Sequence, residues 1–188
     1  MRICRIITSI CLLISSLRGA TGIEVQLKPD DWRRAEEKIA RFKPGDFPNL
    51  PAELRKVLED RGCTIPQPYN AGGQKKNVIT GAFTIAGETD WAVLCSHEKR
   101  SAILVFSGER SSRQLAKLAE EADSQHLQVV AGAHEIGYSR VLTVATAQLI
   151  RQHFAHANHD GIEDTFLQKA SVVWYRSGRK WVRFPGAD

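Results

Sequence analysis

The sequence predicts an α+β fold, in which one antiparallel sheet of about five to six strands has helices packed on one face. Some segments repeat apolar residues at helical spacing, whereas others are runs of β-branched and aromatic residues. Short polar turns join the β-type runs, so hairpins replace strict alternation of strand and helix. We expect a single domain over residues 50–188, preceded by an N-terminal helix and a proline-rich linker in residues 23–49.

The N-terminus has the features of a secretory signal peptide over residues 1–22. Arg2 and Arg5 precede an apolar run over residues 6–17, and the small residues Ala20-Thr21-Gly22 follow it. The apolar run is too short to span a bilayer, and no later segment is apolar for long enough. We therefore expect cleavage after Gly22, a secreted or periplasmic protein, and no membrane span.

The charge of the mature chain argues against nucleic acid as a partner. The whole chain has 26 Lys and Arg against 21 Asp and Glu, and the predicted signal removes Arg2, Arg5 and Arg18 but no acid. The remainder has 23 basic against 21 acidic residues, a net charge of +2. A nearly neutral domain lacks the basic surface that binds nucleic acid phosphates.

Cysteine usage predicts one disulfide. Two of the 4 cysteines, Cys4 and Cys11, lie in the predicted signal, which leaves Cys63 and Cys95. In an oxidising compartment two thiols with no third favour a disulfide. A catalytic thiol is the alternative, but neither cysteine has a neighbouring CxxC motif or a nucleophile turn.

Two helices are expected before the first strands. Trp32, Ala35, Ile39 and Phe42 form one stripe over residues 30–42, and a proline-rich stretch follows. A second helix begins after Pro51 and ends at Gly62, with Leu54, Val57 and Leu58 on its apolar face. We expect the first helix to be peripheral.

Three consecutive antiparallel strands are expected next, over residues 77–83, 90–96 and 101–107, with Cys95 in the second. The charged residues 97–100 suit a hairpin turn. Helical spacing of Leu115, Leu118, Ala119 and Ala122 predicts a helix over residues 111–123. The remaining elements are a short strand near residues 126–130, a helix over residues 143–154 and a closing hairpin over residues 169–184 that turns at Ser177-Gly178.

The stretch HFAHANHDGIED, residues 153–164, is the main candidate for chemistry. His153, His156 and His159 are spaced three residues apart, but on a helix only neighbouring pairs of them share a face. A zinc site needs three or four converging ligands. We therefore favour solvent-facing histidines in the last turn of a helix over a zinc site.

The same stretch also fits a calcium-loop pattern. Counted from His156, the residues Asn158, Asp160, Gly161 and Asp164 match positions 3, 5, 6 and 9 of D-x-[DN]-x-D-G-x-x-D. This resembles the calcium loops of FG-GAP and VCBS-type repeats. The resemblance implies weak calcium binding by Asn158, Asp160 and Asp164. The alternative is a polar turn in which Asn158 and Asp160 bond to the backbone nearby.

An earlier stretch, GAFTIAGETDWAVLC, is similar to the same repeats in Phe83, Gly87 and Asp90. Ala82, Thr84 and Ala86 stand where those repeats have metal ligands, so we expect Asp90 to close the turn by accepting backbone N–H bonds. The chain has too few strands for a propeller. It is also similar to a group of uncharacterised secreted bacterial proteins that carry both phrases, a resemblance that implies no particular activity.

Two other features bear on function. HEIGY at His134 begins like a zinc-protease helix, but Tyr138 stands where the second histidine is needed. The closing hairpin carries Trp174, Tyr175 and Trp181, which are candidate anchors for a sugar ring or a protein partner. Strand alternation places Trp174 and Tyr175 on opposite faces.

Two functions remain open. The first is a non-enzymatic secreted or periplasmic binding module for an envelope or extracellular ligand, with calcium as its only candidate cofactor. The second is a hydrolase of cell-envelope or carbohydrate material that uses carboxylates or histidines of residues 153–164. The hydrolase needs a concave pocket in which this segment meets a second polar cluster, such as His97, Glu98 or His134.

Overall fold

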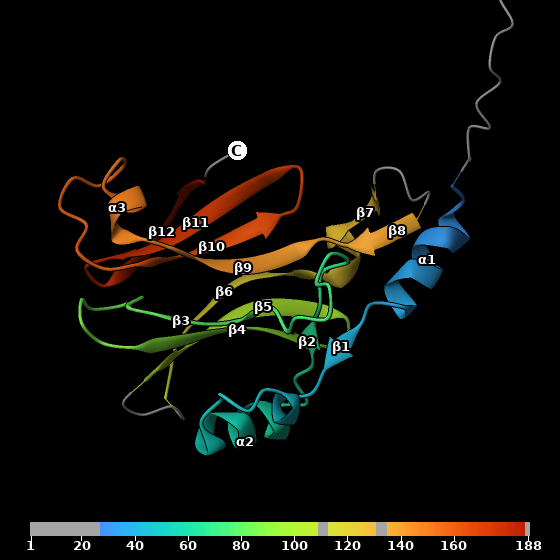
Figure 1. Cartoon of the computed structure of the whole chain (residues 1–188), viewed down its shortest axis with the longest axis horizontal. Coiled ribbons are helices and arrows are strands. Elements are labelled where there is room, and N and C mark those ends of the chain that lie inside the picture. Colours follow the sequence, from blue (N-terminus) through green and yellow to red (C-terminus); the bar gives the residue numbers. More distant parts are fainter. Residues whose placement is uncertain (1–26, 109–112, 131–134, 187–188) are drawn as a thin grey trace, which may run out of the picture.

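A computed structural model of the chain describes residues 27–108, 113–130 and 135–186 (Figure 1). The described elements, in chain order, are α1 (Pro29–Glu37), β1 (Arg41–Phe42), the 3-10 turn η1 (Pro44–Asp46), α2 (Ala52–Asp60), β2 (Ile65–Pro66), β3 (Val78–Gly81), β4 (Asp90–His97), β5 (Arg100–Ser107), β6 (Gln114–Ala122), the 3-10 turn η2 (Asp123–His126), β7 (Leu127–Val130), β8 (Glu135–Tyr138), β9 (Arg140–Ala145), α3 (Ala147–Ile150), β10 (Gly161–Phe166), β11 (Ala170–Ser177) and β12 (Lys180–Pro185). The predicted signal, residues 1–22, lies outside the described residues.

Two four-stranded antiparallel sheets form most of the fold. Their strand orders are β3-β4-β5-β6 and β12-β11-β10-β9, so each is a meander of consecutive strands. The two sheets face each other, and the two-stranded ribbons β1-β2 and β7-β8 lie together with α1 at one end of the stack (Figure 1). The predicted α+β fold, with one sheet covered by helices on one face, is therefore wrong. The described chain is mostly β.

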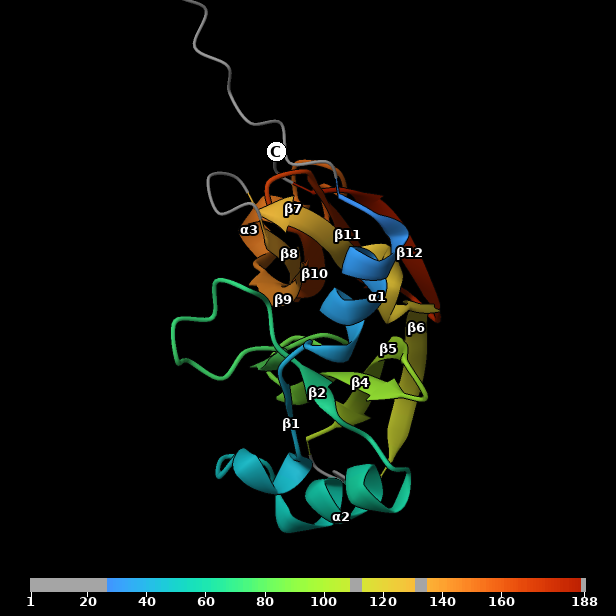
Figure 2. The same cartoon turned by 90° about the vertical axis from the view of Figure 1, so that its right-hand side faces the viewer.

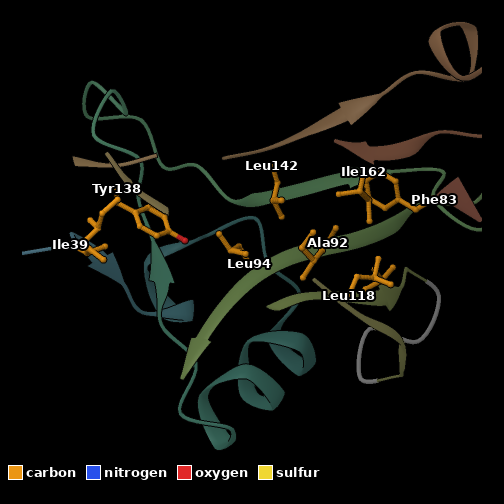
Figure 3. Close-up of a cluster of buried hydrophobic side chains, with 11 residues drawn as sticks. Ile39, Phe83, Ala92, Leu94, Leu118, Tyr138, Leu142 and Ile162 are labelled. Atoms are coloured by element: carbon orange, nitrogen blue, oxygen red, sulfur yellow. The ribbon is translucent and has the colours of Figure 1, made fainter. Parts of the chain in front are cut away.

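Side chains between the two sheets form the central core. Figure 3 shows Leu142 and Ile162 of one sheet facing Ala92 of the other. A second apolar cluster lies on the outer face of β4 and β5, where α2 packs (Figure 2). Successive side chains of β4 point to opposite faces of the sheet, so Leu94 packs in the central core and Val93 packs in the outer cluster. The middle strands of this sheet are therefore buried on both faces.

The predicted helix over residues 111–123 is wrong, because this segment forms strand β6. The apolar residues of this strand are spaced as in a helix, and two β-bulges allow them to face the core from a strand. Gln114 and Ala116 pair with consecutive residues of β5, so Leu115 is an extra residue. A second irregularity follows Leu118, at Ala119, whose φ is +49°. As a result, neighbouring apolar residues reach the same central core, and the pattern imitates the apolar face of a helix.

The predicted helix over residues 143–154 is also largely wrong. Strand β9 continues to Ala145 because it pairs with β10 over its whole length. Only Ala147–Ile150 is helical, and the Thr146 side chain caps this turn by accepting from the Leu149 N–H at 3.4 Å.

Several other predicted elements are confirmed. Helix α2 begins after Pro51, and the three strands over residues 78–107 pair as an antiparallel meander. Glu98 and Lys99 have φ of 48° and 61°, as the tight turn between β4 and β5 requires. The short strand at Leu127–Val130 is present. The closing hairpin turns one residue later than predicted, so that Gly178 stands first in its turn with φ of 59°.

The predicted disulfide is confirmed. Cys63 lies just after α2 and is bonded to Cys95 in β4, with 5.2 Å between the Cα atoms. The Cys63 N–H donates to the carbonyl of Leu58 at 3.0 Å, so the cysteine belongs to the end of the helix. The bond therefore holds α2 on the outer face of the sheet.

A buried arginine joins the two sheets. Arg140 of β9 is fully buried and bonds to Asp164 of β10 through Nε and Nη2, both at 2.8 Å. Its remaining N–H groups reach the other sheet, where Nη2 donates to the Ala119 carbonyl at 2.9 Å and Nη1 lies 3.1 Å from the Ser101 hydroxyl and 3.4 Å from the Ser101 carbonyl. The bulge at Ala119 thus directs a carbonyl at the guanidinium.

Asn77 makes a second connection between the sheets. Its carbonyl accepts from Leu94 of β4, and its side-chain oxygen accepts from Leu142 of β9, both at 2.9 Å. Its amide donates to the Pro66 carbonyl at 2.6 Å and to the Arg140 carbonyl at 3.2 Å. Asn77 has φ of 70°, a conformation that asparagine tolerates better than most residues.

The ion pair predicts a specific set of stabilities. Asp164→Asn should lower the free energy of unfolding by about 3–5 kcal/mol, because it leaves the buried guanidinium without its counter-ion. In Arg140→Met/Asp164→Leu both charges are absent, and we expect it to be more stable than Asp164→Asn. Urea denaturation measures both values. The control, Asp30→Asn in the exposed pair with Arg33, should change stability by less than about 0.5 kcal/mol. Equal losses at positions 30 and 164 would refute the structural role of Arg140.

The disulfide should contribute about 3–4 kcal/mol, because it closes a loop with a sequence separation of 32 residues. We expect Cys63→Ala/Cys95→Ala to lower the urea midpoint accordingly, and reductant to lower that of the wild type to a similar value. Reductant should not affect the double variant. A wild-type midpoint insensitive to reductant and equal to that of the variant would contradict the bond.

Candidate ligand-binding groove

Three chain connections meet at the end of the stack opposite α1. They are the β3–β4 connection, the segment of residues 146–160 that contains α3, and the β11–β12 hairpin (Figure 1). A hollow of about 560 Å³ lies between them, and all three connections line it. We call it the end groove.

A buried carboxylate shapes the β3–β4 connection. Asp90 is 1% exposed, and its Oδ2 accepts from the Thr84 backbone N–H at 2.9 Å and from the Thr84 hydroxyl at 2.7 Å. This confirms the expectation that Asp90 closes the turn. Gly87 has φ of 83°, which suits glycine, and the tip of the connection leaves Ile85 51% exposed on the groove wall.

Asp160 ties this connection to the 146–160 segment. Its backbone N–H donates to the Ala82 carbonyl at 2.9 Å, and its Oδ2 accepts from the Ala82 N–H at 3.2 Å. Its Oδ1 accepts from the Ala147 N–H, also at 3.2 Å. A single carboxylate therefore holds one wall of the groove against another.

A row of rings covers the outer face of the β9–β12 sheet beside the groove. The ring of Phe154 lies 5.4 Å from Tyr175 and 5.5 Å from Phe184, centroid to centroid. His159 stacks on Tyr175, and the ring of His153 lies tilted against Phe184, with 4.4 Å between the ring centroids in each pair. These contacts fix the 146–160 segment on the sheet, although it has only one short helical turn.

The three histidines do not converge on a metal site. His153 and His156 are exposed, whereas His159 is 7% exposed. Its Nδ1 lies 2.9 Å from the Asp160 carbonyl oxygen and its Nε2 lies 3.0 Å from that of Arg176. The prediction of solvent-facing histidines in the last turn of a helix is wrong, because the helix ends at Ile150 and His159 is buried. Within the part of the chain that the structure describes, no group of three or more His, Cys, Asp or Glu residues is arranged to hold a metal ion.

The three residues of the calcium hypothesis have separate surroundings. Asn158 is exposed and lines the end groove. Asp160 bonds to backbone N–H groups of Ala82 and Ala147, and Asp164 is paired with Arg140. Calcium binding by this loop is a hypothesis from the sequence, and these bonds argue against it.

The aromatic residues of the closing hairpin separate as strand alternation predicts. Trp174 and Trp181 are half-buried against the central core, whereas Tyr175 lies on the other face and lines the end groove. Sequence reasoning did not identify Ile85 or Phe154 as groove residues. An apolar residue at the tip of a polar turn, as at Ile85, is the one signal that points to a binding surface.

Of the residues proposed as the second polar cluster of a hydrolase, the two that the structure describes do not line the groove. His97 and Glu98 lie in the β4–β5 turn and line a different hollow, of about 260 Å³, beside Cys95. His134 lies outside the described residues. Glu135–Tyr138, the remainder of HEIGY, forms strand β8 and not a helix.

The lining of the end groove combines apolar and polar groups. Its basic residues are Arg176, His156 and His159, and no Asp or Glu among the described residues lines it. Comparisons with protein-family models, with curated proteins and with solved structures find no match to this chain. Across residues 27–108, 113–130 and 135–186, no helix combines the length and apolar character needed to cross a membrane.

Calcium should leave the melting temperature unchanged, because the carboxylates of Asp160 and Asp164 already bond to other groups in the folded protein. Thermal melts in millimolar calcium and in chelator measure the difference. Asp160→Ala should melt lower than the wild type in both solutions, while Asp60→Ala, at an exposed site of α2, should not. A rise in calcium that only Asp160→Ala abolishes would establish the loop as a calcium site.

Proposed function

We propose that this protein is an exported, non-enzymatic binding module that holds a small envelope or extracellular ligand in the end groove. The observation that carries the proposal is the groove itself, a hollow of about 560 Å³ assembled from three connections that are far apart in sequence. Ligand pockets typically measure about 300–1,000 Å³ and combine apolar walls with a few polar groups.

The fixed walls of the groove support a binding role. Asp90 and Asp160 each use a carboxylate to hold backbone N–H groups, and the two ring nitrogens of His159 lie 2.9 and 3.0 Å from carbonyl oxygens. A groove that is already formed loses little conformational entropy when it takes up a ligand.

The positions of the carboxylates favour binding over hydrolysis. A glycosidase needs two carboxyl groups that face each other across the scissile bond. Asp160 and Asp164 are the acids of the 153–164 segment other than Glu163, and both use their oxygens in structural bonds. Glu163 accepts from the hydroxyls of Thr143 and Ser171 on the β9–β12 sheet and does not line the groove.

Two observations support export. The N-terminal sequence predicts a secretory signal, and the Cys63–Cys95 disulfide is compatible with an oxidising, extracellular or periplasmic location.

A fragment titration followed by NMR tests the proposal. Phenol, benzamide, benzoate and methyl glucoside are added in turn to the ¹⁵N-labelled protein. We expect at least one fragment to shift the amide signals of Phe154, Tyr175 and Arg176. Ile85→Ser should weaken that binding about tenfold, because it removes an apolar wall.

Val129→Ser is the matched control, because Val129 is 47% exposed but does not line the end groove. It should leave the fragment affinity unchanged. Shifts that map elsewhere, or none for any fragment, would refute a ligand site in the end groove.

A further inference from the structure

The charges around the end groove differ from those of the other hollows. The hollow at the β4–β5 turn combines Arg61, Arg100 and Lys117 with Glu98 and Glu120, so acids accompany its cations. In the end groove, Arg176 is accompanied by two histidines and by no carboxylate among the described residues.

Lys75 lines the hollow beside Trp91, where no acidic residue accompanies it, but this lysine contacts other groups of the protein. There Lys75 Nζ bonds to the Asp46 carbonyl and lies 5.4 Å from the ring centre of Phe42. Arg176 forms no ion pair with a described residue, although it is half-buried. Of these three hollows, the end groove is the one in which an arginine has neither a counter-charge nor another described partner for its side chain.

Contacts with neighbouring residues hold the backbone of Arg176 in place. The residue lies in β11 and pairs with Trp181 of β12, and its carbonyl faces Nε2 of His159 at 3.0 Å. On one side the chain continues into Tyr175, whose ring is stacked on His159. A side chain on such a fixed strand loses less freedom when it binds a ligand than one on a loose connection.

His159 holds the groove wall beside Arg176. Its Nδ1 lies 2.9 Å from the Asp160 carbonyl oxygen and its Nε2 lies 3.0 Å from the Arg176 carbonyl oxygen. The ring therefore fixes the position of the strand that carries the arginine.

We infer, on the basis of the proposed binding function, that the ligand of the end groove carries a carboxylate that pairs with Arg176. The planar guanidinium presents two parallel N–H groups to a carboxylate, a geometry that amides and hydroxyls do not match. Ile85 and Phe154 line the same groove and supply apolar surface for the body of the ligand. The ligand class is a small carboxylic acid on a compact apolar or sugar ring.

Matched pairs of probes test this inference on the wild-type protein. Benzoate and benzamide share one shape but differ in charge, and methyl glucuronide and methyl glucoside form the corresponding pair for a sugar ring. We expect the acid of at least one pair to bind about tenfold more tightly than its neutral partner, as measured by NMR titration. The preference should shrink as salt is added. The pair with the larger preference identifies the ring that carries the carboxylate.

Arg176→Gln should abolish the preference for the acid while neutral probes still bind. Arg183→Gln is the matched control, because Arg183 is an exposed arginine on the neighbouring strand that does not line the groove. It should keep the full preference. Arg176→Lys should keep part of it, because lysine retains the charge but not the planar fork.

The outcomes separate this inference from the proposed function. If acid and neutral probes bind the groove equally, the groove is a binding site but the carboxylate inference is wrong. The inference is also wrong if the preference survives in Arg176→Gln. If none of the probes reaches the groove, the proposed function fails together with it. The comparison within each pair uses the unaltered chain, so it holds even if a variant folds poorly.

Discussion

The guanidinium of Arg140 is the constraint on which the rest of the fold depends. It lies between two sheets whose facing side chains are mostly apolar, and its five N–H groups donate to oxygens of Asp164, Ser101 and Ala119. A buried charge is tolerated only when its hydrogen bonds are complete, so these oxygens specify how the sheets align. The effect reaches neighbouring groups: burial, and then the positive charge of Arg140, lower the pKa of His126. The core between the sheets therefore contains one buried guanidinium with all of its N–H groups hydrogen-bonded, within surroundings that are mostly apolar.

One short stretch of sequence connects this centre to the groove. Residues 159–164 contain His159 and Asp160, which fix the groove walls, and Asp164, which neutralises Arg140. Gly161 lies between them, where a Cβ atom would approach the Trp174 carbonyl oxygen to 2.8 Å, so only glycine fits. Short polar side chains and a glycine are typical of metal loops. The same residue types also suit a strand that begins in close contact with its neighbours, where the side chains bond to backbone groups. The walls of the end groove and the alignment of the sheets therefore depend on the same short stretch of sequence.

The sequence predicts local features well and the arrangement of sheets poorly. The disulfide, helix α2, the strands around Cys95 and the role of Asp90 follow from residue chemistry within short windows. Strand β6 was missed because its bulges give Leu115 and Leu118 a helical spacing, which pairing with β5 overrides. The groove was missed because its walls come from three connections, and nothing in the sequence near Ile85 indicates that Arg176 lies across from it. Both the strand and the groove depend on contacts between segments that are distant in the sequence, and short windows of sequence do not contain this information.

The burial of β4 and β5 on both faces has a consequence for how the protein matures. In an unfolded chain, the segments Ala92–Cys95 and Ala102–Phe106 are consecutive β-prone stretches without a charge. Until α2 covers one side and the second meander the other, this hairpin can template the same segment of another molecule into a cross-β aggregate. Glu98, Lys99 and Arg100 place charges at one end of it, as gatekeeper residues do. The second meander follows this hairpin in the sequence and is synthesised after it, so solubility depends on shielding of the hairpin until that sheet has formed.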